Sequence, residues 1–427
     1  MSIENVTIAP RDTKTATLTF DISWSNSWRD KNNHDAVWVF FKVRPDDKAD
    51  WQHARLAADK VLNPAGYGQA QGGTPLDSIV PDGDDGFTGM FVRRAAEGEG
   101  TLSARRVTAL WDFTANKGMP EDLKGVSVRA FGIRMVYVPE GPFHLGSGGV
   151  EVGGFYQHAD GGQQTRPYQV TGPGAIATGR QAGRLWVRKH GGQLEDGGQV
   201  PASFPNGYAA FYCMNHQIAP EQYAAFLSTL TAAQSDARYP TLGDKPRGPG
   251  VIRSGQAPNY TYSFKAGAAR QGPGCVGLSW ADGAAFAAWA GLRPMTELEL
   301  EKAVRGPREP VPDEIGPSYW GIGGFGGWDW DAVKGDCQCE RPVTVGNAAG
   351  RKFKGTHGRG TLTLPADWPQ EDAVGAGVRC TYYSPGQSLD LQRARLSDRF
   401  LAAVADPERY GNHKWRGVRT APKGVGP

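Results

Sequence analysis

The amino-acid sequence predicts an α+β protein, with an all-β N-terminal part followed by a part that carries a few short helices among loops. Apolar and polar residues alternate in several stretches of the first 132 residues, which is the period of half-buried strands. Helical spacing and helix-capping residues occur between residues 220 and 306. Glycine makes up 59 of the 427 residues, about twice the usual share of roughly 7%, which is typical of a chain rich in turns.

The N-terminal part is expected to form a sandwich of β-strands. The alternating stretches lie at residues 16–24, 37–43, 107–113 and 126–130, and the second of them is apolar on both faces. Strands at this spacing, with no helical segment between them, favour a sandwich. The acidic stretch at residues 82–86 lacks the spacing and the closing Glu of an EF-hand, so an acidic turn is expected there.

Three helices are expected in the second part of the chain. The first begins near Pro220, the second after Ser279 and the third after Thr296. Each start carries a helix signal, which is either a proline at the first position or a Ser or Thr followed three residues later by an acidic side chain. Gly291 and Gly306 are expected to end the second and third helices.

Composition and charge limit the expected location of the protein and the class of partner that it can bind. The net charge of +3 is too small over 427 residues to indicate nucleic acid or an anionic membrane as a partner. No secretory signal is visible at the N-terminus, and no apolar run approaches the roughly 20 residues that span a bilayer. The five cysteines are an odd number. We therefore expect reduced thiols, no membrane insertion and a cytoplasmic location by default, with export by another route left open.

The segment from residue 375 to 422 combines a regular frame with an irregular filling. Residues 375–379, 397–399 and 415–420 form the frame. No helical or strand period orders the residues between them, where aromatic, aliphatic, acidic and hydroxyl side chains are mixed. Tyrosine gives a large amphipathic area at low entropy cost, and small polar residues give adaptable hydrogen bonds. The filling therefore favours an exposed contact surface over a core.

Several motifs, in order, resemble the formylglycine-generating-enzyme family of sulfatase-modifying factors, whose domain is an elaborated C-type lectin fold. They are residues 135–147, 211–223, 276–282, 289–297 and 415–419. These resemble the opening strands, the entry to the first helix, the central helix pair and the closing strand of that family. The resemblance covers roughly residues 133–422 and implies a C-type lectin domain of this type at residues 133–427, preceded by the Ig-like β-sandwich that the alternation predicts at residues 1–132.

The enzymes of that family depend on two cysteines, a few residues apart, that follow an Arg-Gly-Gly-Ser-like turn. Thiolates are needed because they hold copper(I) and activate oxygen. Here the turn corresponds to residues 379–383, and the positions of the pair fall near Pro385 and residues 389–390, which hold no cysteine. Cys380 comes too early, and no cysteine follows it. We therefore expect no catalysis. The alternative is a copper- or iron-dependent oxidase of the same superfamily with a displaced metal site.

A narrower resemblance is to the variable proteins of diversity-generating retroelements. It is carried by residues 341–347, 375–377, 397–399 and 416–422, while Cys380 stands where that subgroup usually has glycine. In the subgroup the C-terminal segment is rewritten at adenine-containing codons, and the residues that such codons can encode match the filling described above. The resemblance implies a ligand-binding protein whose expected partner is a macromolecule, with a protein as the expected class.

The variable ligand-binding face is predicted to lie within about residues 378–415. Its predicted contact residues are Thr381, Tyr382, Tyr383, Ser384, Pro385, Leu389, Asp390, Leu391, Phe400, Leu401, Asp406, Glu408, Tyr410, Asn412 and His413. The scaffold residues expected beneath this face are Arg379, Asp398, Arg399, Trp415 and Arg416. Asp398 is predicted to form an ion pair with Arg379, Arg395, Arg399 or Arg416, and separate solvated charges are the alternative.

No cofactor is expected, although the related enzymes carry structural calcium and a calcium ion is therefore left open. Its ligands have no residue-by-residue match in this sequence. The pair Cys337 and Cys339 is a weak metal motif because no second pair lies near it, and the eight histidines show no H-x-x-x-H or H-x-H spacing.

A third possible function is that of an assembly protein whose N-terminal sandwich makes the main interaction. The sequence identifies neither the ligand nor the oligomeric state.

Overall fold

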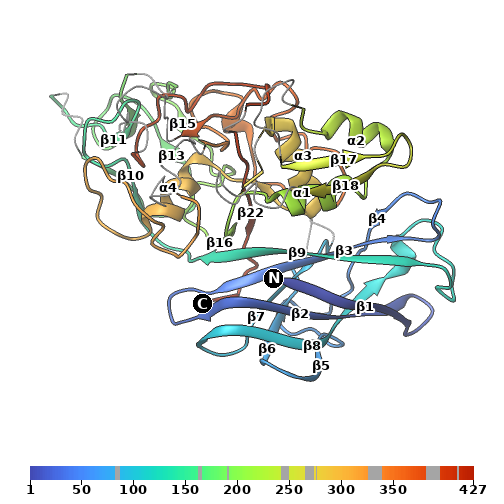
Figure 1. Ribbon diagram of the computed structural model, residues 1–427. Helices are drawn as coiled ribbons and strands as arrows, with labels where there is room; N and C mark the ends of the chain where they lie inside the picture. Colours follow the sequence, from blue (N-terminus) through green and yellow to red (C-terminus); the bar gives the residue numbers. More distant parts are fainter. Residues whose placement is uncertain are drawn as a thin grey trace.

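The computed structural model describes residues 1–81, 87–161, 166–189, 192–241, 250–264, 274–275, 277–325, 339–380, 395–410 and 413–427. In this part the chain is rich in β-strands and contains four α-helices. Figure 1 shows the N-terminal strands on one side of the molecule and the helices on the other, with strands β3 and β9 between them. The acidic stretch at residues 82–86 lies outside the described residues.

The first sheet contains four antiparallel strands of the N-terminal part. Their order in the sheet is β1, β2, β8 and β5. Their bounds are β1 Ser2–Pro10, β2 Thr15–Arg29, β8 Gly98–Asp112 and β5 Gly68–Gly73. A short 3-10 helix at Phe113–Ala115 follows β8. The alternation that predicted strands at residues 16–24 and 107–113 is confirmed for β2 and β8.

The second, larger sheet runs through both parts of the chain. Its order is β19, β22, β16, β9, β3, β7 and β6, with β4 paired to β3. Their bounds are β19 Arg293–Pro294, β22 Gly417–Thr420, β16 Phe211–Met214, β9 Ser127–Val138, β3 Asp35–Arg44, β7 Met90–Arg94, β6 Leu76–Ile79 and β4 Gln52–His53. Strand β9 pairs with β3 on one side and with β16 on the other. The boundary expected at residues 132–133 therefore falls inside a strand that both parts share.

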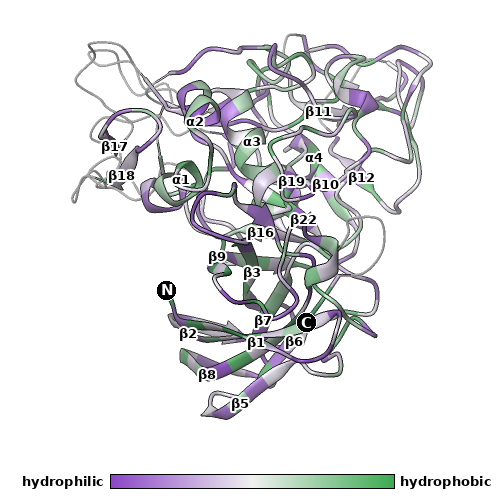
Figure 2. Ribbon diagram, turned by 90° about the vertical axis from the view of Figure 1, so that its right-hand side faces the viewer, coloured by the Kyte–Doolittle hydropathy of each residue, from purple (hydrophilic) through white to green (hydrophobic). Residues whose placement is uncertain are grey.

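Strand β3 separates two hydrophobic cores. Val37, Val39 and Phe41 pack with residues of the first sheet in one core. Trp38 and Phe40, on the opposite face of the strand, pack with the helices in the other core. Figure 2 shows the hydrophobic residues of β3 between the N-terminal strands and the helices. The apolar character of both faces, visible in the sequence, thus reflects a strand that is buried between two layers.

The four helices are α1 Pro220–Leu227, α2 Ala232–Arg238, α3 Trp280–Ala290 and α4 Glu297–Arg305. The three predicted starts are confirmed, and Gly291 ends α3 at a φ of 73°, a conformation that favours glycine. Helix α2 was not predicted from the sequence, although Thr231 and Gln234 form a capping box at its start. No helix within the described ranges is long and apolar enough to cross a membrane.

Short strand pairs and turns fill the rest of the second part. The pairs are β10 Phe143–Leu145 with β12 Tyr168–Val170, β11 Phe155–Gln157 with β14 Leu185–Val187, β13 Ile176–Ala177 with β15 Gln199–Val200, β17 Val251–Ser254 with β18 Thr261–Phe264, and β20 Cys339–Glu340 with β21 Arg379–Cys380. A 3-10 helix covers Gly350–Lys352. Cys339 is disulfide-bonded, which corrects the expectation that all the cysteines are reduced.

Candidate functional site

The predicted contact residues fall into two groups in the structure. Nine of them lie outside the described residues, namely Thr381, Tyr382, Tyr383, Ser384, Pro385, Leu389, Asp390, Leu391 and Asn412. The other six are described, and they are Phe400, Leu401, Asp406, Glu408, Tyr410 and His413. The described part of the candidate site therefore consists of these six residues and the scaffold residues.

Five of the six described contact residues are at least partly accessible. Phe400 is 39% exposed and Tyr410 is 44% exposed, and Glu408 is also exposed. Leu401 and Asp406 are half-buried, and Leu401 packs against Cys339 and Val378. Exposed aromatic side chains supply most of the binding energy at typical protein contacts. Phe400 and Tyr410 therefore present part of their aromatic surface to solvent.

His413 differs from the expectation because its side chain is buried. Arg341 donates a hydrogen bond from Nη1 to Nδ1 of His413 over 2.8 Å, and the His413 ring packs edge-on against Tyr410 with 4.8 Å between ring centres. Burial, reinforced by the Arg341 charge, lowers the pKa of His413 to about 3. His413 is therefore a buried, neutral side chain that packs against Tyr410.

The carboxylate of Glu297 lies beneath the C-terminal segment. Arg399 donates to it from Nε and Nη2 over 2.7 and 3.0 Å, and both side chains are fully buried. Arg379 lies 3.5 Å from the same carboxylate. Thr344 Oγ1 and the backbone N–H of Val345 donate to its Oε1 over 2.8 and 2.7 Å. Both oxygens of Glu297 are thus saturated by donors from three separate segments.

The position of Glu297 follows from its place at the first residue of helix α4. A carboxylate is favoured there because the free N–H groups make this end of a helix positive. The sequence Glu297-Leu298-Glu299-Leu300-Glu301 buries all three acids, which are 0, 1 and 0% exposed. Glu299 serves the capping box and pairs with Arg293 over 2.6 Å. The role of Glu297 was missed from the sequence, although three acids in a helix that also carries leucines were a signal for buried arginine partners.

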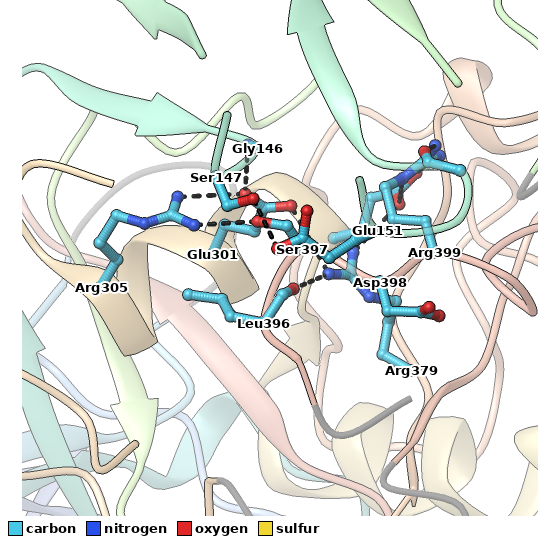
Figure 3. Close-up of polar contacts among 12 residues, drawn as sticks. Gly146, Ser147, Glu151, Glu301, Arg305, Arg379, Leu396, Ser397, Asp398 and Arg399 are labelled. Atoms are coloured by element: carbon cyan, nitrogen blue, oxygen red, sulfur yellow. Dashed lines mark hydrogen bonds and ion pairs between the residues drawn. The ribbon is translucent and has the colours of Figure 1, made fainter. Parts of the chain in front are cut away.

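Glu301 forms a second anchor one turn further along α4, as Figure 3 shows. Its Oε2 accepts the backbone N–H of Gly146 over 2.8 Å and lies 3.2 Å from Arg305. Arg305 in turn donates to Ser397 Oγ over 3.0 Å. Arg379 lies 3.5 Å from Glu301 and donates to the carbonyl of Leu396. The segment at residues 396–399 is therefore fixed to α4 at two successive turns.

The four arginines predicted as possible partners of Asp398 each contact another carboxylate. The four candidate arginines pair with other carboxylates, which are Glu297 and Glu301 for Arg379, Asp313 for Arg395, Glu297 for Arg399 and Glu340 for Arg416. Oδ1 of Asp398 accepts the backbone N–H of Phe400 over 3.0 Å, which shapes the turn. Arg379 and Arg399 thus contact acids of α4 that lie about 80–100 positions earlier in the chain, and an ion pair of Asp398 itself stays a prediction.

The charge state of Glu297 fits a structural role. Burial alone would raise the pKa of this carboxyl, but the charges of Arg399 and Arg379 and the hydrogen bond from Thr344 outweigh burial and hold the pKa below its usual 4.5. The carboxylate is therefore ionised at neutral pH and has no proton to exchange. No group of three or more His, Cys, Asp or Glu side chains is placed to hold a metal ion within the described ranges.

Trp415 and Arg416 fix the far end of the C-terminal segment. Trp415 is fully buried and packs edge-on against Trp280, with 6.2 Å between ring centres. Arg416 pairs with Glu340 over 3.1 Å, donates to the carbonyl of Met214 over 2.7 Å and stacks over the ring of Phe325. Both residues therefore belong to the core, as their predicted scaffold role requires.

Comparison with known families gives one match. Residues 132–348 match the model of the sulfatase-modifying factor enzyme 1-like domain. The match begins within strand β9, includes all four helices with Glu297 and Glu301, and ends before the C-terminal segment. A search of curated proteins found no match.

Proposed function

Because the chain belongs to the sulfatase-modifying factor enzyme 1-like family, we propose that it uses the fold of that family, a C-type lectin fold, as a scaffold for binding. In this proposal it is a variable protein of a diversity-generating retroelement. The residues that it displays between about 378 and 415 contact a macromolecular ligand, and a protein is the expected class. The N-terminal strands form an Ig-like sandwich that carries this scaffold.

The observation that carries the proposal is the shared anchor at Glu297. Arg379 and Arg399 both contact this buried carboxylate, so the chain leaves and returns to one fixed point on either side of residues 380–398. Because the two arginines make the closing contacts, the ends of the segment between them stay together whichever side chains that segment carries. Such an arrangement suits a segment whose sequence has to change while the fold persists.

The exposed aromatic residues on the described part of the segment support the same function. Phe400 and Tyr410 expose 39% and 44% of their surface beside a well-packed frame. Replacing an exposed side chain usually changes stability by less than about 0.5 kcal/mol, whereas truncating a core side chain costs roughly 2–5 kcal/mol. The buried frame therefore provides the stability of the fold, and the exposed surface provides the contacts with a ligand.

The thiol chemistry of the chain supports binding over oxidation. No cysteine follows Cys380 in the sequence. Cys213 and Cys275 are buried thiols, and burial raises the pKa of the Cys213 thiol to about 12 and that of Cys275 above its usual range. A protonated thiol is a poor ligand for copper. The second candidate, a copper- or iron-dependent oxidase, would need a thiolate pair that these two residues do not supply.

The proposal is tested by comparing two libraries of the full-length protein. The first is randomised at the fourteen predicted contact positions other than the buried His413, and the second at an equal number of buried frame positions that include Glu297, Arg399 and Trp415. We expect most clones of the first library to resist protease and most clones of the second to be digested. We also expect binders to arise from the first library after selection against an unrelated protein such as lysozyme.

Two results would count against the proposal. One is equal protease sensitivity of the two libraries, which would mean that the contact positions carry the fold. The other is oxygen consumption by the purified protein after loading with copper(I), which would favour the oxidase. Randomising His413 in addition provides an internal check, because its burial predicts that most of the clones with a large change at this position are digested.

A further inference from the structure

A hollow of about 870 Å³ lies beside residues 351–367, and it is lined by an excess of positive charge. Its cationic side chains are Arg351, Lys352, Lys354 and Arg359, and its acidic side chain is Asp367. The formal charge of the lining is therefore 4 − 1 = +3, which equals the net charge of the whole chain. The excess of basic over acidic side chains in this hollow is thus as large as the excess in the whole chain of 427 residues.

Within the described part of the chain these four cations lack an acid at ion-pair distance, unlike the buried arginines of the frame. Arg399 and Arg416 are each neutralised by a carboxylate within 3.1 Å. None of the four cations of the hollow forms an ion pair in the described structure. Asp367 uses its Oδ2 to accept the backbone N–H of Lys354 over 2.8 Å, so its carboxylate shapes the loop. Arg351 donates from Nη1 to the carbonyl of Val345 over 2.8 Å and lies near the charge of Glu195, so Lys352, Lys354 and Arg359 are the exposed cations that can contact a ligand.

The backbone around Arg359 is held in place by its glycine neighbours. The N–H groups of Gly358 and Gly360 donate to the carbonyls of Leu292 and Ala288 over 2.8 and 2.9 Å. A Cβ atom on Gly358 would lie 2.3 Å from the Cα of Ala288, so only glycine permits this close approach. Arg359 stands between the two glycines with an exposed side chain. The loop is thus fixed to helix α3 and its end while it presents a guanidinium outward.

Hydroxyl groups complete the lining. Ser203, Thr356, Thr361 and Thr363 face the same hollow as the cations. Guanidinium forks, ammonium groups and hydroxyls together match the many acceptor oxygens of a phosphate or sulfate group. The volume lies within the range of about 300–1,000 Å³ that is usual for small-molecule sites. We propose that this hollow binds a small molecule that carries a phosphate or sulfate ester.

A neighbouring cavity of about 430 Å³ shares Arg359 and Thr361 with the hollow and is also lined by Trp51 and Trp289. The uncharged part of the ligand would lie toward these aromatic side chains. Lys42 also lines this cavity, but its Nζ already donates to the carbonyls of Trp289 and Gly360 over 2.8 and 2.7 Å and contacts His53 Nδ1. Lys42 therefore holds the strands to the helices, and recognition is left to Lys352, Lys354 and Arg359.

The test measures binding of inorganic phosphate, inorganic sulfate, glucose 6-phosphate and glucose to the full-length protein by calorimetry at constant ionic strength. The test variant K354Q/R359Q removes two charges from the hollow. The control variant K31Q/K60Q removes two exposed charges from the N-terminal part. We expect saturable binding of the anionic probes by the wild type and the control, at least about tenfold weaker binding by the test variant, and no binding of glucose.

The relative affinities of phosphate and sulfate then identify which ester the site prefers. Urea unfolding of the three proteins should coincide, because all four replaced side chains are exposed. R359K, which keeps the charge but loses the fork, provides a second variant and should weaken binding less than R359Q. The proposal is overturned by absence of saturable binding of all three anionic probes to the wild type, or by equal affinities of the wild type and K354Q/R359Q.

Discussion

Replacing Glu297 by glutamine should destabilise the protein strongly. The substitution keeps the shape of the side chain but removes the negative charge between two buried arginines, Arg379 and Arg399. The amide group would also direct N–H donors toward guanidinium groups that have only donors. Oε1 can still accept from Thr344 and Val345, so the main effect is the uncompensated charge.

The size of the effect follows from the burial of the pair. Glu297 and Arg399 are both 0% exposed, and breaking such a buried pair by removing one partner typically costs about 3–5 kcal/mol. Folded proteins are stable by only about 5–15 kcal/mol in total. We therefore expect Glu297→Gln to remove about 3–5 kcal/mol from the free energy of unfolding. The double variant E297Q/R399Q should lose less than the sum of its two single changes, because the second change removes the unpaired charge.

Urea unfolding followed by tryptophan fluorescence measures this loss, with Glu309→Gln as the control because Glu309 is exposed on the segment after α4. The folded-state pKa of Glu297 lies below its usual 4.5. The unfolded state therefore binds more protons as the pH falls, and the stabilisation by Glu297 is present above pH 4.5 and lost below it. The wild type and E297Q should converge in that acidic range. A loss at pH 7 no larger than that of Glu309→Gln would refute the anchor.

Three further predictions concern the surface and its support. F400S and Y410S should each change the free energy of unfolding by less than about 1 kcal/mol in urea, because both side chains are substantially exposed; a larger loss would place them in the core. The ring of His413 should stay neutral from pH 8 to 5 in an NMR titration, since its pKa is about 3. Because this pKa lies below the usual 6.5, the unfolded state binds the proton first, and the burial of His413 should lower the free energy of unfolding as the pH falls below 6.5. Protonation of the ring near pH 6.5 would contradict its burial. Gly283→Ala should lower stability by about 1–3 kcal/mol in thermal unfolding, because its Cβ would lie 2.1 Å from Cγ of Trp415; an unchanged transition would show that Trp415 can move.

The elements that the sequence predicted well are those set by local chemistry. The alternation in β2 and the capping pairs at Ser279 and Thr296 depend on residues within a few positions of one another, and the structure has both. The double-sided apolar pattern of β3 also proved informative, because the strand lies between two cores.

The features that the sequence did not reveal depend on long-range pairing. Strand β9 joins the two parts of the chain in one sheet because its two neighbours, β3 and β16, lie far apart in sequence. The anchor at Glu297 joins residues separated by about a hundred positions, and no local pattern encodes such a partner. The same limit applies to His413, whose burial is set by Arg341 and Tyr410.

The most direct test of a diversified binding face is the DNA sequence around the gene. We predict a near-copy of the codons for residues 375–422 beside a reverse-transcriptase gene, with differences only where the copy has adenine. The differences should fall at codons such as those of Tyr382 and Tyr410, and the codons of the anchoring residues Arg379 and Arg399 should be unchanged. Absence of any such copy, or differences that fall mainly on the two anchoring codons, would contradict the account.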